Sequence, residues 1–147
     1  MPVISVTRLH VRSWRHLPQV LAATLGSAMQ ARGAPGCLAV SVLSESWRTY
    51  WTRTAWQDEA AMVAFVQAGT HRRIMGRVML WCDESSVVHW TEAVGALPSW
   101  RLAHRRLSEH GRHFPPPRRA GDASASGAFP EPFPAPRARR WRDLRIK

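Results

Sequence analysis

The sequence has no asparagine, and only one of its 21 basic residues, Lys147, is a lysine. Its two cysteines, Cys37 and Cys82, lie far apart without C-x-x-C spacing, so neither a zinc site nor a disulfide framework is predicted. We therefore expect a reducing, cytoplasmic location. No apolar run approaches the roughly 20 residues that a transmembrane helix needs, so no transmembrane segment is expected.

Several motifs that define enzyme classes are also missing. The sequence has no H-E-x-x-H pair, no glycine-rich phosphate loop, no Ser/His/Asp spacing and no paired carboxylates. The sequence therefore offers no local catalytic or phosphate-binding motif. Candidate functional residues must therefore be found from the fold, because no local pattern marks them.

The length and composition of the chain are sufficient for one globular domain with a substantial hydrophobic core. The chain has 147 residues, of which 45% are hydrophobic, and eight are tryptophans. This composition excludes wholesale disorder. The net charge is +11, and residues 99–147 carry twelve of the 21 basic and four of the ten acidic residues. The positive charge therefore belongs mostly to the C-terminal part of the chain.

The order of elements predicts an α+β, ferredoxin-like βαββαβ fold. Alternation of apolar residues predicts strands at residues 3–13, 37–44, 48–56 and 85–93. Helices are expected after Ser13 to about residue 32, after the N-cap Asp58, and from Thr70 to about residue 82. The run at residues 17–31 could imitate a signal peptide, but its apolar residues have helical spacing. An antiparallel four-stranded sheet with helices on one face results.

Both faces of the middle strands carry large apolar residues. Trp51 and Arg53 share one face of the third strand, and Trp56 lies on the other. A second copy of the chain would bury the face that the helices leave open, so we predict a homodimer. The predicted boundaries are a domain at residues 1–96, a basic helix at 97–112 and a disordered Pro/Ala/Arg-rich tail at 113–147.

The basic tail has an arginine cluster around Trp141, which could contact nucleic acid, anionic lipid or an acidic partner through charge alone. No groove-fitting motif accompanies it. We therefore interpret the tail as a solvated extension and predict no specific binding to nucleic acid.

Two stretches resemble a known superfamily. The stretch "WTRTAWQDEAAMVAFVQAGTHRRIM", followed by "WCDESSVVHW", resembles the dimeric α/β-barrel proteins that include the antibiotic biosynthesis monooxygenases and small haem-degrading monooxygenases. It is most similar to a branch of uncharacterised bacterial proteins related to spheroidene monooxygenase. The resemblance covers about residues 3–93. It implies a homodimer with its two sheets face to face, and a pocket between sheet and helices in each monomer.

The resemblance also bears on cofactors. Haem accompanies the spheroidene relatives, which would make His71 an axial ligand. The haem-degrading relatives use an Asn, a Trp and a His, whereas this chain has no Asn and places Phe65 and Met75 near the other two positions. Haem degradation of that type is therefore not expected. Both a haem-dependent and a cofactor-free reaction remain open, and no other metal site is predicted.

His71 is the candidate catalytic residue, because helical spacing puts it on one stripe with Ile74, Met75, Val78 and Cys82. Its alternative role is structural, as a hydrogen-bonding group at a helix start. Arg72 could draw in an anion or simply be solvated. The residues predicted to bind a ligand are Trp51, Arg53, Phe65, Arg72, Met75 and His89.

The expected function is that of a monooxygenase-like protein that acts on or binds a small apolar ligand. The alternative is a non-catalytic ligand-binding or dimerisation module that has kept the fold. Fold alone does not decide between the two.

Overall fold

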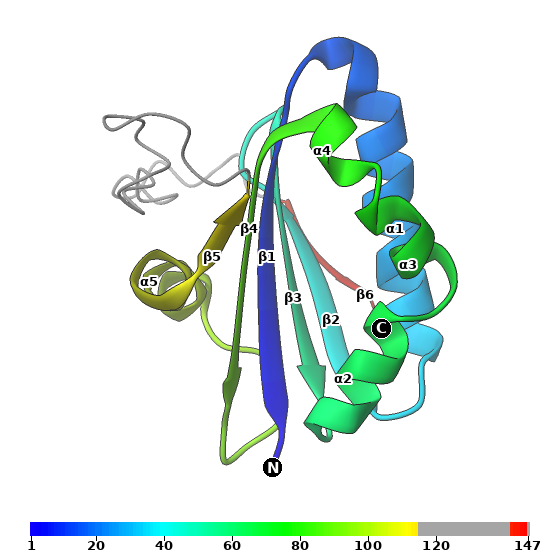
Figure 1. Cartoon of the computed structure of the whole chain (residues 1–147). Coiled ribbons are helices and arrows are strands. Elements are labelled where there is room, and N and C mark those ends of the chain that lie inside the picture. The colour runs from blue at the N-terminus through cyan, green and yellow to red at the C-terminus, as the bar shows by residue number, and fades with distance from the viewer. Residues whose placement is uncertain (115–141, 147) are drawn as a thin grey trace.

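The computed structural model describes residues 1–114 and 142–146, and its centre is one antiparallel sheet (Figure 1). The strand order is β5-β4-β1-β3-β2-β6. The strands are β1 (Val3–Val11), β2 (Cys37–Ser44), β3 (Thr49–Trp56), β4 (Cys82–Thr91), β5 (Arg112–Phe114) and β6 (Arg142–Ile146). The predicted α+β, ferredoxin-like arrangement is confirmed in its four inner strands.

Helices cover both faces of this sheet. One face carries the short η1 (Trp14–His16), α1 (Leu17–Gly33), α2 (Glu59–Val66), α3 (Gly69–Met75) and α4 (Val78–Trp81), while α5 (Trp100–His110) lies on the other (Figure 1). The side chain of Asp58 caps α2 by accepting a hydrogen bond from the Ala61 amide at 2.8 Å, as predicted. No helix in the described part of the chain is long and apolar enough to cross a membrane.

The helix predicted from Thr70 to about residue 82 is divided in two. Helix α3 ends at Met75, Gly76 and Arg77 connect it to α4, and β4 already begins at Cys82. The side chain of Ser13 caps η1, which precedes α1, and α3 begins at Gly69, one residue before the predicted start at Thr70. The break lets the chain turn back to the sheet, where Cys82 pairs with Val11.

Within the described residues the sheet has six strands, whereas four were predicted. Strand β5 pairs with β4, and β6 pairs with β2, both antiparallel. Two segments of the predicted tail, residues 113–114 and 142–146, belong to these strands. The physical reason is that β4 and β2 would otherwise be open edges, whose free backbone groups readily pair with an extended segment. The rest of the tail, residues 115–141 and 147, lies outside the described residues.

The second face of the sheet is covered by the chain itself. Ala103 and Leu107 of α5 are fully buried in one cluster with Ile4, Val6 and Trp51. Helix α5, within the predicted basic helix at 97–112, therefore packs on the domain. The apolar character of this face, from which a homodimer was predicted, is accounted for by α5 without a second copy.

Buried charges on this second face are paired. The Arg53 guanidinium lies 4.0 Å from the centre of the Trp100 ring and donates a hydrogen bond to the Pro98 carbonyl. Arg8 forms ion pairs with Glu84 and Glu45. Each buried cation therefore has the partners that its desolvation requires.

We expect Leu107→Ala to lower the free energy of unfolding by about 2–5 kcal/mol, because it leaves a cavity beneath α5. Urea unfolding measures this change. The control Leu80→Ala alters an exposed leucine and should change stability by less than about 0.5 kcal/mol. Equal stability of the two variants would mean that α5 does not dock on the sheet.

Candidate functional site

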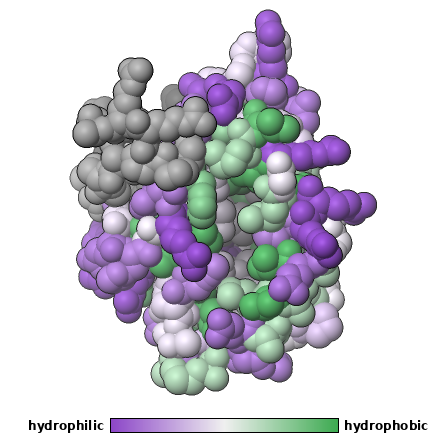
Figure 2. Space-filling view, viewed as in Figure 1, coloured by the Kyte–Doolittle hydropathy of each residue, from purple (hydrophilic) through white to green (hydrophobic). Residues whose placement is uncertain are grey.

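A cavity of about 340 Å³ lies between the sheet and the layer of α1 to α4. Figure 2 shows apolar side chains on both sides of the hollow in this region. Among the described residues no aspartate, glutamate, lysine or arginine lines it, and most of its wall is apolar. Its apolar and aromatic lining includes Val20, Ala28, Trp56, Met62, Phe65, Ile74, Met75, Val78, Met79, Trp81, Val87 and Phe114.

The sheet side of the cavity has a row of hydroxyl groups. Ser5 and Thr7 of β1 face it, and their partners on β3 are Thr54 and Thr52. On the other side of β1, Ser5 pairs with His89 of β4. Because paired residues in neighbouring strands put their side chains on the same face, these groups form a polar strip in an otherwise apolar floor.

The helix side adds two further hydroxyls from α1. The Oγ1 atom of Thr24 and the Oγ atom of Ser27 are buried, and neither has a hydrogen-bond partner within the described residues. Thr24 is only 7% exposed. A buried hydroxyl without a partner costs free energy, which a bound molecule would recover only by reaching the oxygen.

Helix α1 also fixes where α3 begins. The side-chain amide of Gln30 donates to the Ala68 carbonyl at 2.9 Å, and its oxygen accepts from the backbone amide of His71, also at 2.9 Å. Gly69 has a positive φ of 54°, and a Cβ atom there would lie 3.0 Å from the Gln30 side chain. The start of α3, and with it His71, is therefore held against α1.

The imidazole of His71 is oriented by two neighbours. Its Nδ1 lies 3.3 Å from the Val66 carbonyl, and its ring centre lies 4.7 Å from that of Phe65. Phe65 in turn stacks on Trp56 at 4.9 Å. Since a carbonyl only accepts, this contact favours a proton on Nδ1, leaving Nε2 as an acceptor with no hydrogen-bond partner in residues 1–114.

Burial also favours the neutral form of His71. Loss of water around the ring lowers the pKa of His71, and the hydrogen bond to Val66 opposes this only in part. At neutral pH the ring is therefore uncharged and able to accept a proton. The earlier alternatives of a structural role and a ligand-facing role do not exclude each other, because one ring nitrogen contacts the backbone and the other is left available.

Two other titratable side chains line the cavity. Partial burial and the nearby charge of Arg112 lower the pKa of His89, whose side chain remains partly exposed. Burial and the nearby carboxylate of Asp83 raise the pKa of the Cys82 thiol to about 11. Cys82 is therefore a protonated thiol at neutral pH and an unreactive part of the wall.

The predicted ligand-binding residues are only partly brought together. Phe65, His71, Met75 and His89 all line the cavity. Trp51 and Arg53 lie on the opposite face of the sheet, under α5, so their assignment to a ligand site is corrected. Their aromatic and charged character serves packing against Trp100. Arg72 is exposed on α3 and does not line the cavity.

The hydroxyl-bearing residues were missed from sequence. Alternation along β3 put Thr52 and Thr54 on the face opposite Trp51, which was the available signal for the sheet side. Thr24 and Ser27 gave no comparable signal, since the hydroxyl groups of small polar residues in a helix usually form hydrogen bonds with nearby backbone carbonyls. Within the described ranges no three metal-binding side chains come together.

Comparisons with known proteins find similarity in the fold. No protein-family model matches the sequence, and no curated protein matches it. Among solved structures, it resembles a variant of SnoaB, a cofactor-independent oxygenase from Streptomyces nogalater, with 15% identity and a TM-score of 0.53 over 63% of this chain and 94% of that one.

Two further solved structures are similar to this chain over a comparable share of its length. Rv0793 from Mycobacterium tuberculosis gives a TM-score of 0.58 with 15% identity, over 65% of this chain and 99% of the other. A putative antibiotic biosynthesis monooxygenase from Nitrosomonas europaea gives 0.55 with 14% identity, over 63% and 90%. At such identities the likeness concerns the fold and leaves activity open. The chain therefore has the α+β, monooxygenase-like fold of the antibiotic biosynthesis monooxygenase group.

Proposed function

We propose that this protein is an oxygenase that binds a small, neutral and mostly apolar molecule in the cavity, with His71 as the catalytic base. One observation carries the proposal: the unpartnered Nε2 of a neutral His71 adjoins an uncharged cavity that has hydroxyl groups on its other walls. An apolar wall with a few placed polar groups is typical of small-molecule sites. The name of SnoaB as a cofactor-independent oxygenase agrees with this chemistry.

In the proposed reaction, Nε2 of His71 takes a proton from an acidic C–H group of the substrate. The Val66 carbonyl, which contacts Nδ1, stabilises the imidazolium that forms. The resulting carbanion reduces O₂ directly. A CH₂ group becomes C=O: two C–H bonds break, one oxygen atom enters the product, and the other leaves as water with both protons. The substrate itself supplies all the electrons.

Haem fits this cavity poorly. Nε2 of His71 is a suitable axial ligand, but no arginine or lysine lines the cavity in the described part of the chain to pair with the two propionates. The volume of about 340 Å³ is near the lower end of the roughly 300–1,000 Å³ range of small-molecule pockets. The residues present therefore favour the cofactor-free reaction over the haem-dependent one.

The homodimer, the relation to spheroidene monooxygenase and the cytoplasmic location stay predictions. A dimer that packs sheet against sheet would have to accommodate α5, whose inner residues already cover Trp51 and Ile4. Sedimentation at micromolar concentration separates a monomer from a dimer. The catalytic proposal does not depend on the outcome, because all the lining residues come from one chain.

We expect His71→Gln to slow oxygen uptake by about 10²–10⁴-fold, the usual contribution of a general base. The assay uses an oxygen electrode and a panel of aromatic ketones whose CH₂ group is flanked by two aromatic rings. Arg72→Gln changes the next residue, which does not line the cavity, and should keep the wild-type rate. Compounds that bind without oxygen uptake would assign the protein to the non-catalytic alternative.

The pH dependence of oxygen uptake should report the pKa of His71. Because burial lowers that pKa, the base stays neutral at pH 7, and activity should fall only at a pH below the ordinary histidine value of about 6.5. Phe65→Ala removes the ring that contacts the imidazole and admits water, so the acid limb should move up towards 6.5. An acid limb that stays in place in this variant would contradict a base at His71.

Thr24→Val should affect the stability of the free protein and its affinity for a polar ligand in opposite directions. Replacing a buried, unpartnered hydroxyl by a methyl group of similar shape should leave the melting temperature unchanged or raise it. Affinity for a ligand with a hydroxyl or carbonyl group should fall by about 1–3 kcal/mol, while affinity for its hydrocarbon analogue should not. Calorimetry with such a pair tests this, and equal losses for both would contradict a polar contact at Thr24.

A further inference from the structure

Helix α1 exposes apolar residues on its outward face. Only one of its 17 residues, Arg32, is charged. Leu21, Leu25 and Met29 follow one another at intervals of four residues on the outward side and are 36%, 46% and 56% exposed. The outward face of a surface helix is normally polar. This stripe is therefore an apolar surface that nothing in the described part of the chain covers.

Two tryptophans extend this stripe near the N-terminal end of α1. Trp14 in η1 and Trp47 in the loop between β2 and β3 are both more than half exposed. Each carries an arginine against its ring: Arg15 lies 5.9 Å from the centre of Trp14, and Arg48 lies 5.3 Å from that of Trp47. We call the five apolar residues together the α1 surface: Trp14, Leu21, Leu25, Met29 and Trp47.

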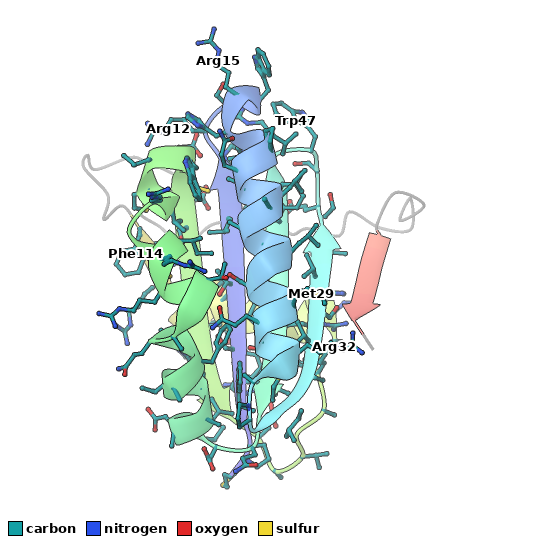
Figure 3. The ribbon with its side chains drawn as sticks, turned by 90° about the vertical axis from the view of Figure 1, so that its right-hand side faces the viewer. Arg12, Arg15, Met29, Arg32, Trp47 and Phe114 are labelled. Carbon is teal, nitrogen blue, oxygen red and sulfur yellow. The ribbon has the colours of Figure 1, made fainter. Side chains whose placement is uncertain are left out.

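Arginines surround this α1 surface. Figure 3 shows Arg12 and Arg15 at the same end as Trp47, with Met29 and Arg32 towards the other end of the helix. No aspartate or glutamate occurs anywhere in residues 1–44. Near Arg48 the carboxylate of Asp83 is present, but it is paired with His10 at 2.6 Å and with Arg48 at 3.7 Å. The surface is therefore apolar along its middle and positively charged at its margins.

We propose that the α1 surface docks the protein onto an anionic lipid bilayer. Apolar side chains that enter the acyl boundary, indoles at the headgroup level and arginines that pair with lipid phosphates are the features of helices that lie in a membrane interface. A second copy of the chain fits less well, because a two-fold contact would bring the arginines of the two α1 surfaces together.

Docking would put the cavity next to the source of an apolar ligand. The inward side of α1 carries Val20, Thr24 and Ser27, which line the cavity, while its outward side carries the apolar stripe. One helix thus separates the cavity from the proposed lipid contact. The docking itself does not depend on the proposed oxygenase activity, so each can fail without the other.

Co-sedimentation of the full chain with vesicles tests the proposal. We expect binding to vesicles of phosphatidylglycerol and phosphatidylcholine, and little binding to phosphatidylcholine alone. Arg15→Gln/Arg32→Gln should weaken the partition coefficient by roughly 10-fold or more, since each arginine near an anionic surface contributes severalfold. The control Arg101→Gln/Arg105→Gln removes the same charge from exposed positions on α5, across the sheet, and should change binding much less.

The apolar stripe is tested separately by Leu25→Ser/Met29→Ser, which alters two exposed residues and should leave the circular dichroism spectrum unchanged. We expect this variant also to lose binding at least 10-fold. Equal losses in the α1 and α5 arginine pairs would mean that charge acts without regard to position, for instance through the basic tail, and would overturn the proposal. A second combination of results would also overturn the proposal: the protein does not bind anionic vesicles, and sedimentation velocity shows self-association that Leu25→Ser/Met29→Ser abolishes. The α1 surface would then bind a second copy of the chain.

Discussion

The structure depends on strand β3 being covered on both sides. Trp51 and Trp56 lie on opposite faces of this strand, and both are almost completely buried. Trp51 packs under α5, whereas Trp56 packs with α1 and α2 beneath the helical layer. Burial of such large rings contributes strongly to folding, so neither cover can be removed without exposing a tryptophan. The fold is therefore a sheet between two helical layers rather than a sheet with one open face.

The two faces of the sheet differ in the side chains that they bury. The α5 side is filled and contains paired charges, with Arg53 against Trp100 and Arg8 against two glutamates. The other side leaves about 340 Å³ unfilled and contains hydroxyl groups, two of which have no partner in the described residues. Packing under α5 stabilises the fold, while an unfilled, mostly apolar face with a few hydroxyl groups is suited to a ligand.

Helix α1 connects the candidate site to the molecular surface. Through Gln30 it holds the start of α3 and thereby His71, and through Thr24 and Ser27 it forms part of the cavity wall. Its outward face carries the apolar stripe. One helix with almost no charged residues therefore has an apolar character on two sides, which explains why its amphipathic pattern is weak in the sequence.

The sequence by itself determined the elements that have a strong local signal. The alternation of residues 37–44 and 48–56 and the cap at Asp58 follow from backbone periodicity and local hydrogen bonds, and they predicted the ferredoxin-like order. Of the residues predicted to bind a ligand, Phe65, His71, Met75 and His89 line the cavity. Only the tertiary structure decided which face of the sheet holds the cavity. It placed Trp51 and Arg53 on the face covered by α5, a helix from a distant part of the chain. It also revealed Thr24, because the lack of a hydrogen-bond partner for its hydroxyl depends on the residues around it in space rather than on its neighbours in sequence.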